Sequence, residues 1–375
     1  MIYLDYSANT PVDARVLEQF CAVERRCIGN ANSHHQAGSA AKAEIDAATI
    51  KIASLLGVQP AEIIYTSGAS EANNFALKGL ARLSRHAGRH IISTPLEHSS
   101  VSGTLTALQE QGYEIDLLDV KQDGTVDLEH LKDLLRPDTI CVAITLVDSE
   151  LGVVQPVQEI AAILKAYPHC HLHVDATQAV GKIPVSFEGV DTMSLTAHKF
   201  YGLNGIGLLI KRRNLALEPL IHGGESTTIY RSGTPTVALA SSLACALDLA
   251  VTDLPGRVDH VAKLNAELRA ALSTYPLVRI NSPDHAIPHV LNLSVRNVKG
   301  TVFQRELDAK GVCVSVKSAC SSDGLPSRAV FAVSRDRRNA LSSWRISLSH
   351  LTTEDEIKAF LQAFDVCCRE LTAVH

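Results

Sequence analysis

Short apolar runs alternate with amphipathic stretches over much of the first half of the chain. The apolar runs predict buried strands at residues 62–66, 90–94, 114–119, 140–146 and 172–175. Stretches with apolar residues at helical spacing predict helices at residues 37–56, 71–85, 101–111, 127–135 and 157–166. Strand–helix alternation is typical of a mainly parallel sheet that helices cover on both faces. The pattern therefore predicts an α/β fold.

The pattern changes near Leu254-Pro255-Gly256. Beyond this point we expect helices at 258–275 and 301–309, strands at 290–295, 312–316 and 344–349, and a final helix after Thr353, which opens a capping box. A chain of 375 residues also exceeds the size at which a single core stops growing, roughly 250–300 residues. We therefore predict a large domain of residues 16–254 and a smaller α+β domain of residues 1–15 and 255–375.

Lys199 lies between two further apolar runs, residues 190–195 and 208–210, on a short glycine-rich connection. An ammonium group is costly to bury, unless it is paired or neutral. A neutral amine can attack a carbonyl, so one interpretation is a Schiff-base lysine for pyridoxal phosphate. The alternative is a lysine whose stem is buried and whose amine reaches the surface.

A turn of small residues, 66–73, joins a predicted strand to a predicted helix. Ala69 and Ser70 stand where the helix begins, and small residues let the backbone approach an anion closely. The free N–H groups and positive dipole end of the helix can then bind a phosphate. The alternative is a helix cap without a ligand.

Polar side chains end two other predicted strands. Asp175 stands at the edge where open α/β sheets bind ligands, and it can pair with a protonated pyridine nitrogen or cap a helix. Gln178 can reach a phenolic oxygen of the same ring, and His98 can stack on a flat cofactor. His171 and His173 share a strand face with Asp175, but we predict no metal site.

Two residues in the second half of the chain are candidates for acting on or binding a substrate. Residues 315–327 are nearly all small and polar, so we expect a mobile loop whose thiol, Cys320, can enter a site and withdraw. Lys317 nearby favours the thiolate. Arg345, inside a predicted strand, indicates bidentate carboxylate binding or a structural ion pair.

These motifs resemble the cysteine desulfurases of the NifS/IscS type, which are pyridoxal-phosphate enzymes of the class V aminotransferase group. The resemblance runs over nearly the whole chain. It is carried by Asp5-x-x-Ala8, Thr66-Ser67-Gly68-Ala69-Ser70-Glu71, Glu97-His98, His173-Val174-Asp175-Ala176-x-Gln178, His198-Lys199, Arg231-Ser232-Gly233-Thr234, Ser318-Ala319-Cys320-Ser321-Ser322 and Arg345-x-Ser347-Leu348. It implies fold type I of the pyridoxal-phosphate-dependent transferases.

The resemblance also implies roles for individual residues. Lys199 would bind the cofactor and move the Cα proton, and His98 would stack on the ring, which Asp175 and Gln178 would hold. Arg345 would bind the substrate carboxylate, and Cys320 would take the sulfur of L-cysteine as a persulfide, releasing alanine. The phosphate would be held by Ala69, Ser70, Thr196 and His198, and by Thr234 of the neighbouring subunit in a homodimer.

One departure concerns the substrate site, since Ser149 stands where the family usually has an asparagine near the ring and the carboxylate. We expect a serine there to weaken carboxylate binding. The sulfur acceptor stays open among proteins of iron–sulfur assembly, tRNA thiolation and DNA phosphorothioation. A selenocysteine lyase or other class V enzyme, or a non-catalytic partner of a sulfur-transfer complex, are alternatives.

The composition of the chain bears on its partners and its cellular location. A net charge of −5 without blocks of like charge gives no reason to expect direct nucleic-acid binding. No apolar run is long enough to span a bilayer, so we expect no membrane association. The nine cysteines form no C-x-x-C pair, which favours a reducing, cytoplasmic location.

Overall fold

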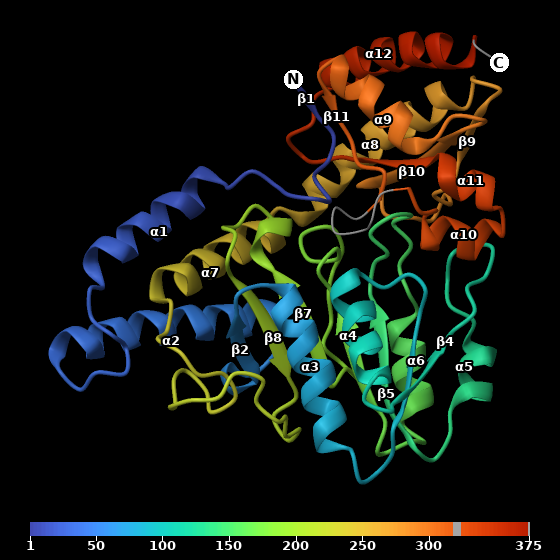
Figure 1. Cartoon of the computed structure of the whole chain (residues 1–375). Coiled ribbons are helices and arrows are strands. Elements are labelled where there is room, and N and C mark those ends of the chain that lie inside the picture. Colours follow the sequence, from blue (N-terminus) through green and yellow to red (C-terminus); the bar gives the residue numbers. More distant parts are fainter. Residues whose placement is uncertain (318–323, 374–375) are drawn as a thin grey trace.

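A seven-stranded sheet forms the centre of the protein in the computed structural model, which describes residues 1–317 and 324–373 (Figure 1). Its strands are β2 (Ile63–Thr66), β3 (His90–Ser93), β4 (Glu114–Leu117), β5 (Thr139–Thr145), β6 (His171–Asp175), β7 (Thr192–Thr196) and β8 (Gly207–Lys211). They lie in the order β2-β8-β7-β6-β5-β3-β4, and only β8 runs antiparallel to its neighbours. The predicted α/β fold with a mainly parallel sheet is confirmed.

Helices cover both faces of this sheet because neighbouring strand residues point to opposite sides. Ile91 packs in a core cluster with α3 (Ala69–Leu83) and α4 (Ser99–Gln109). Ile92 packs in another, with α5 (Leu128–Leu134), α6 (Val157–Leu164) and α7 (Val237–Thr252). The sequence pattern did not predict α7, because its apolar residues lie on nearly all sides and leave no helical periodicity.

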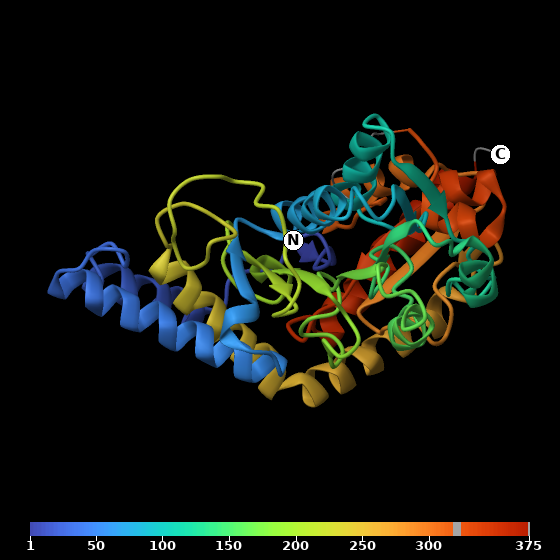
Figure 2. The same ribbon diagram turned by 90° about the horizontal axis from the view of Figure 1, so that it is seen from below.

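Two N-terminal helices, α1 (Ala14–Arg26) and α2 (Gln36–Leu56), pack against α7. Figure 2 shows them projecting beyond the sheet as an arm. In the described part of the chain, no single helix has the length and apolar character to cross a membrane. The bent pair of α7 and α8 (Leu254–Leu272) passes that test by length and composition only.

The C-terminal part builds a separate antiparallel sheet in the order β12-β10-β9, formed by β9 (Val278–Ile280), β10 (Val290–Val295) and β12 (Ser343–Ser347). Helices α8, α9 (Gly300–Ala309) and α12 (Glu354–Thr372) contribute to the core beside it. Phe303 stacks on Trp344 there, with ring centroids 5.1 Å apart. The N-terminal strand β1 (Ile2–Tyr3) joins this part by parallel pairing with β11 (Val312–Cys313).

The buried residues of the C-terminal part form their own cluster, which includes Leu4. We therefore propose the division predicted from the sequence, 16–254 against 1–15 with 255–375. Helices α10 (Arg328–Ser334) and α11 (Arg337–Ser342) were not predicted. They join residues such as Leu96 and Val153 of the large sheet region in a fourth cluster, so they bridge the two parts.

Candidate active site

A cavity of about 350 Å³ lies at the carboxyl ends of β5, β6 and β7 and at the start of α3. This volume is within the range of small-molecule pockets. The predicted site residues that line it are Ala69, Ser70, His98, Ser149, Asp175, Gln178, Thr196, His198, Lys199 and Arg345. The structure thus brings together ten predicted residues from six separate regions of the sequence.

Two predicted residues are not among those lining the cavity. Thr234 is exposed and lies outside the cavity of its own chain. Its expected role is in the neighbouring subunit, so that role stays a prediction. Cys320 lies outside the described residues.

Lys199 ends a short 3-10 turn, Ala197–Lys199, directly after β7. Its Nζ donates hydrogen bonds to the carbonyl oxygens of Ser7 at 2.8 Å and Ala8 at 2.6 Å. The amine is therefore held at the cavity by the N-terminal segment, which excludes the interpretation of a lysine reaching the outer surface.

The start of α3 has the features of an anion site. Its N-cap residue, Gly68, has no side chain that could cap the helix, so the first N–H groups are available to a ligand. A Cβ atom on Gly207 of β8 would lie 2.7 Å from the Cα of Gly68. Glycine is therefore required for the two segments to approach this closely.

A charged pair, Glu71 and Arg231, holds this turn in place. Ser67 donates its N–H to Oε2 of Glu71 at 2.7 Å, and Arg231 donates to Oε1 at 3.0 Å. Burial acts to raise the pKa of Glu71, but the bonds from Arg231 and Ser67 prevail and lower it. Arg231 thus connects the motif that contains Thr234 to the turn at the start of α3.

Thr196 and His198 complete this end of the cavity. Thr196 Oγ1 lies 3.1 Å from His198 Nδ1. Burial, with a smaller effect of the Lys199 charge, lowers the pKa of His198 to about 4. His198 is therefore a neutral hydrogen-bonding group near neutral pH.

Asp175 is fixed by two donors at the end of β6. Its Oδ1 accepts the N–H of Thr177 at 2.9 Å, so it does cap the following turn. Its Oδ2 accepts from Nδ2 of Asn73 at 2.8 Å. Since a carboxylate offers about four lone-pair sites, Asp175 keeps acceptor capacity for a group in the cavity.

Asn73 was missed by the sequence reasoning. It is fully buried in α3, and its Oδ1 accepts from Ser194 Oγ and from His173 Nε2 at 3.0 Å. Burial lowers the pKa of His173 to about 4, so this ring is neutral and serves to orient Asn73. Asn73 stands at helical spacing from Ala76, Leu77 and Leu80, so a polar side chain on the apolar face of the predicted helix was the available signal.

His98 is the N-cap residue of α4. Its Nδ1 accepts the N–H of Ser100 at 3.2 Å, so the proton of the neutral ring is on Nε2. Burial, with Lys199 and Arg328 nearby, lowers the pKa of His98. Ser100 Oγ also accepts from Asn73 at 2.8 Å, so Asn73 links His98 to Asp175.

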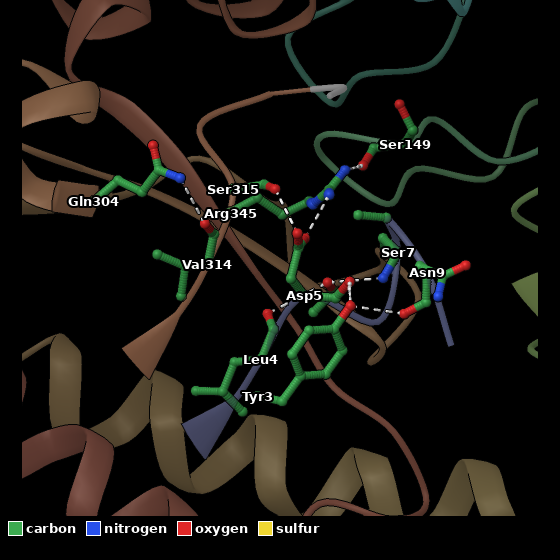
Figure 3. A network of polar contacts seen from close by, with 12 residues as sticks. Tyr3, Leu4, Asp5, Ser7, Asn9, Ser149, Gln304, Val314, Ser315 and Arg345 are labelled. Carbon is green, nitrogen blue, oxygen red and sulfur yellow. Dashed lines mark hydrogen bonds and ion pairs between the residues drawn. The ribbon is translucent and has the colours of Figure 1, made fainter. Parts of the chain in front are cut away.

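Arg345 lies at the opposite wall, with 2% of its side chain exposed (Figure 3). Its Nη2 pairs with Oδ1 of Asp5 at 3.0 Å, and its Nη1 donates to the carbonyl oxygen of Ser149 at 2.7 Å. Its Nε has no partner among the described residues. Arg345 therefore makes the ion pair considered from the sequence and also lines the cavity.

The segment that contains Cys320 begins and ends beside this wall. Ser315 Oγ donates to Oδ2 of Asp5 at 2.7 Å. Ser327 caps α10 and donates to Glu150, at 2.5 Å, next to Ser149. Both described ends of residues 315–327 are thus anchored by hydrogen bonds next to the contacts of Arg345.

Comparison with known proteins places these features in a family. The sequence model of the aminotransferase class-V family matches residues 2–360. A protein of Proteus mirabilis named cysteine desulfurase IscS is 40% identical over 365 residues, which are 95% of this chain and 90% of that protein.

Two solved structures have similar folds. A NifS-like protein has a TM-score of 0.92 and 35% identity, and the match covers 100% of both chains. A structure described as SspA in complex with cysteine has a TM-score of 0.83 and 30% identity, over 94% of this chain and 100% of that one. The chain therefore belongs to the class-V aminotransferase family, within its cysteine desulfurases of the NifS/IscS type.

Proposed function

We propose that the protein is a pyridoxal-phosphate-dependent L-cysteine desulfurase that converts L-cysteine to L-alanine and passes the sulfur to an acceptor protein. One observation carries the proposal. A lysine amine, a fixed carboxylate and an uncapped helix N-terminus face a single cavity, where Lys199, Asp175 and Ser70 lie. The relative in complex with cysteine supports the substrate.

The lining fits the cofactor. Ser70 and the start of α3 offer donors to a phosphate, and Asp175 offers an acceptor to a pyridine nitrogen. The hydroxyl of Thr196, which donates to the carbonyl oxygen of Ile206, would join them by turning toward the phosphate. The cavity also contains polar groups that lack partners in the described chain, since Ser7 Oγ and Thr177 Oγ1 are buried without hydrogen bonds. Such groups are expected where a polar ligand binds. When bound, pyridoxal phosphate supplies an aldehyde for amines and an electron-withdrawing ring.

Three residues of the chain have separate roles in the reaction. Lys199 would hold the cofactor through its amine and would move the proton at the substrate Cα. Arg345 binds the substrate carboxylate through the edge of the guanidinium that Asp5 and Ser149 leave open. The thiolate of Cys320 attacks the substrate sulfur, so that an S–S bond forms, the C–S bond breaks, and the electron pair with a proton completes alanine.

Two substitutions test the proposal. Lys199→Ala should abolish the visible absorbance of the lysine-linked cofactor, and an unchanged spectrum would remove Lys199 from this role. Cys320→Ser should retain pyridoxal phosphate and respond spectrally to L-cysteine, yet release neither alanine nor sulfide. Near-normal alanine production in that variant would favour a lyase that needs no enzyme thiol, such as a selenocysteine lyase. A wild-type protein that binds the cofactor and consumes no cysteine would favour a non-catalytic partner.

We further propose a homodimer in which Thr234 reaches the neighbouring subunit's phosphate. Its exposure and the arm of α1 and α2, with Leu17 and Ile50 exposed, support this arrangement. We also propose a cytoplasmic location, which the eight free cysteines among the described residues support. The acceptor belongs to iron–sulfur assembly, tRNA thiolation or DNA phosphorothioation.

A further inference from the structure

Lys182 is a buried lysine that the proposed function does not use. Only 6% of the residue is exposed, and its Nζ donates to Oε1 of Gln178 at 2.8 Å. No carboxylate pairs with it in the part of the chain that the structure describes. Burial first, then the charges of Lys199 and Arg345, lower the pKa of Lys182 to about 7. A lysine kept in such surroundings calls for a specific role.

Gln178 connects Lys182 to the cavity. Its Oε1 accepts from Lys182, and its Nε2 donates to the carbonyl oxygen of Ser7 at 2.9 Å. The oxygen of the amide faces a donor, the Lys182 amine, and its NH₂ group faces an acceptor, the Ser7 carbonyl. Only this orientation of the amide satisfies both partners. The NH₂ group has a second hydrogen, and Gln178 lines the cavity.

Lys182 itself does not line that cavity. It borders a separate space of about 10 Å³ on the far side of Lys199, together with Gly181 and His289. A space of this size holds about one water molecule and no substrate. Lys182 can therefore influence a ligand through Gln178 or through its charge, but not by contact.

We propose that Lys182 is a positioning residue that locks the Gln178 amide so that its N–H, and not its carbonyl, faces an anionic oxygen of the ligand. With Lys182 absent, the Ser7 carbonyl alone holds the amide, so the orientation rotated by half a turn, which presents Oε1 to the same oxygen, becomes more populated. This inference rests on the proposed function, because the phenolic oxygen of pyridoxal phosphate is the anionic group concerned.

The test measures the dissociation constant of pyridoxal phosphate from the apoprotein rather than turnover. Lys182→Met should weaken binding about tenfold, equivalent to about 1.4 kcal/mol. In a Gln178→Leu background the same substitution should change binding less than twofold, since the group it positions is gone. An equal tenfold loss in both backgrounds would show that the charge acts directly, and would overturn the proposal.

A matched control is available in Lys211, which is 1% exposed and donates to the carbonyl oxygen of Leu215 at 2.6 Å. Lys211→Met should lower stability without changing cofactor affinity. If Lys182→Met does not fold, Lys182→Ala, which also removes the donor to Gln178, replaces it in the same cycle. Wild-type protein that fails to bind pyridoxal phosphate refutes the proposed function. Wild-type binding that Lys182→Met leaves unchanged refutes only this inference.

Discussion

Replacing Asp5 by asparagine separates the two roles of Arg345. The Asp5–Arg345 bond is 3.0 Å long, and the two side chains are 16% and 2% exposed. Asparagine keeps an acceptor of the same shape for Arg345 and can donate to Ser315, so the substitution removes mainly charge. At about 4 Å and an effective dielectric constant of about 20, the charge of Asp5 attracts that of Arg345 by about 4 kcal/mol, and the desolvation of Asp5 offsets part of this, so we expect Asp5→Asn to lower the free energy of unfolding by about 2 kcal/mol.

The same substitution should strengthen substrate binding, because Asp5 repels a carboxylate bound on another edge of the guanidinium. Two unit charges about 6 Å apart at an effective dielectric constant of about 20 repel by about 3 kcal/mol. With partial screening we expect about half of this, which is a roughly tenfold lower KM for L-cysteine and tighter inhibition by L-alanine.

Urea unfolding of the apoprotein and steady-state kinetics check both expectations. The control is Asp46→Asn, which removes a pair with Lys42 whose side chains are 53% and 62% exposed. That change should cost less than about 1 kcal/mol and leave the KM unchanged. If Asp5→Asn lost stability but raised the KM, Asp5 would orient Arg345 for the substrate instead of competing with it, and our reasoning would be wrong.

Three further substitutions have definite expected outcomes. Burial raises the pKa of Glu97 to about 8 from 4.5, so the folded protein keeps a proton that the unfolded chain releases, and wild-type stability falls between these pH values. Glu97→Gln should remove this pH-dependent loss of stability, which urea unfolding at several pH values measures. If the free energy of unfolding fell equally with pH in both proteins, the prediction would be contradicted. Ser149→Asn should lower the KM for cysteine by adding amide donors near Arg345, and an unchanged or higher KM would refute that idea. Gly207→Ala would place its Cβ 2.7 Å from the Gly68 Cα and so displace the start of α3. Pyridoxal phosphate should then bind about tenfold more weakly in a titration. The control Gly103→Ala, whose Cβ meets nothing within 4 Å, should not change binding.

Most of the sheet was predictable from the sequence because its strands, apart from the edge strand β4, are buried on both faces. Such strands are continuous apolar runs, as in β5, where every residue is buried. The same principle explains why α7 was missed, since burial on nearly all sides removes the periodicity that identifies a helix. Local pattern thus identifies elements that have one apolar face or a short apolar run, and fails for a long helix buried all round.

Most of the cavity was also predictable, because its residues follow strands whose ends meet at one edge. The partners of those residues were not. Asp5 was recognised as part of a motif, but nothing in the sequence pairs it with Arg345, which is 340 positions away. Asn73 has the same explanation, since its partner Asp175 is 102 positions away.

The N-terminal segment makes the cofactor and substrate ends of the site depend on one another. The carbonyl of Ser7 accepts from both Lys199 and Gln178, and two residues earlier Asp5 binds Arg345. The segment is itself fixed within the C-terminal part, because the buried Leu4 accepts the N–H of Ser347 at 2.7 Å. A shift of this segment therefore moves the amine, the amide and the guanidinium together. Three side chains on independent loops would not respond in this way, so substitutions that disturb packing around Leu4 should alter cofactor and cysteine affinity in parallel.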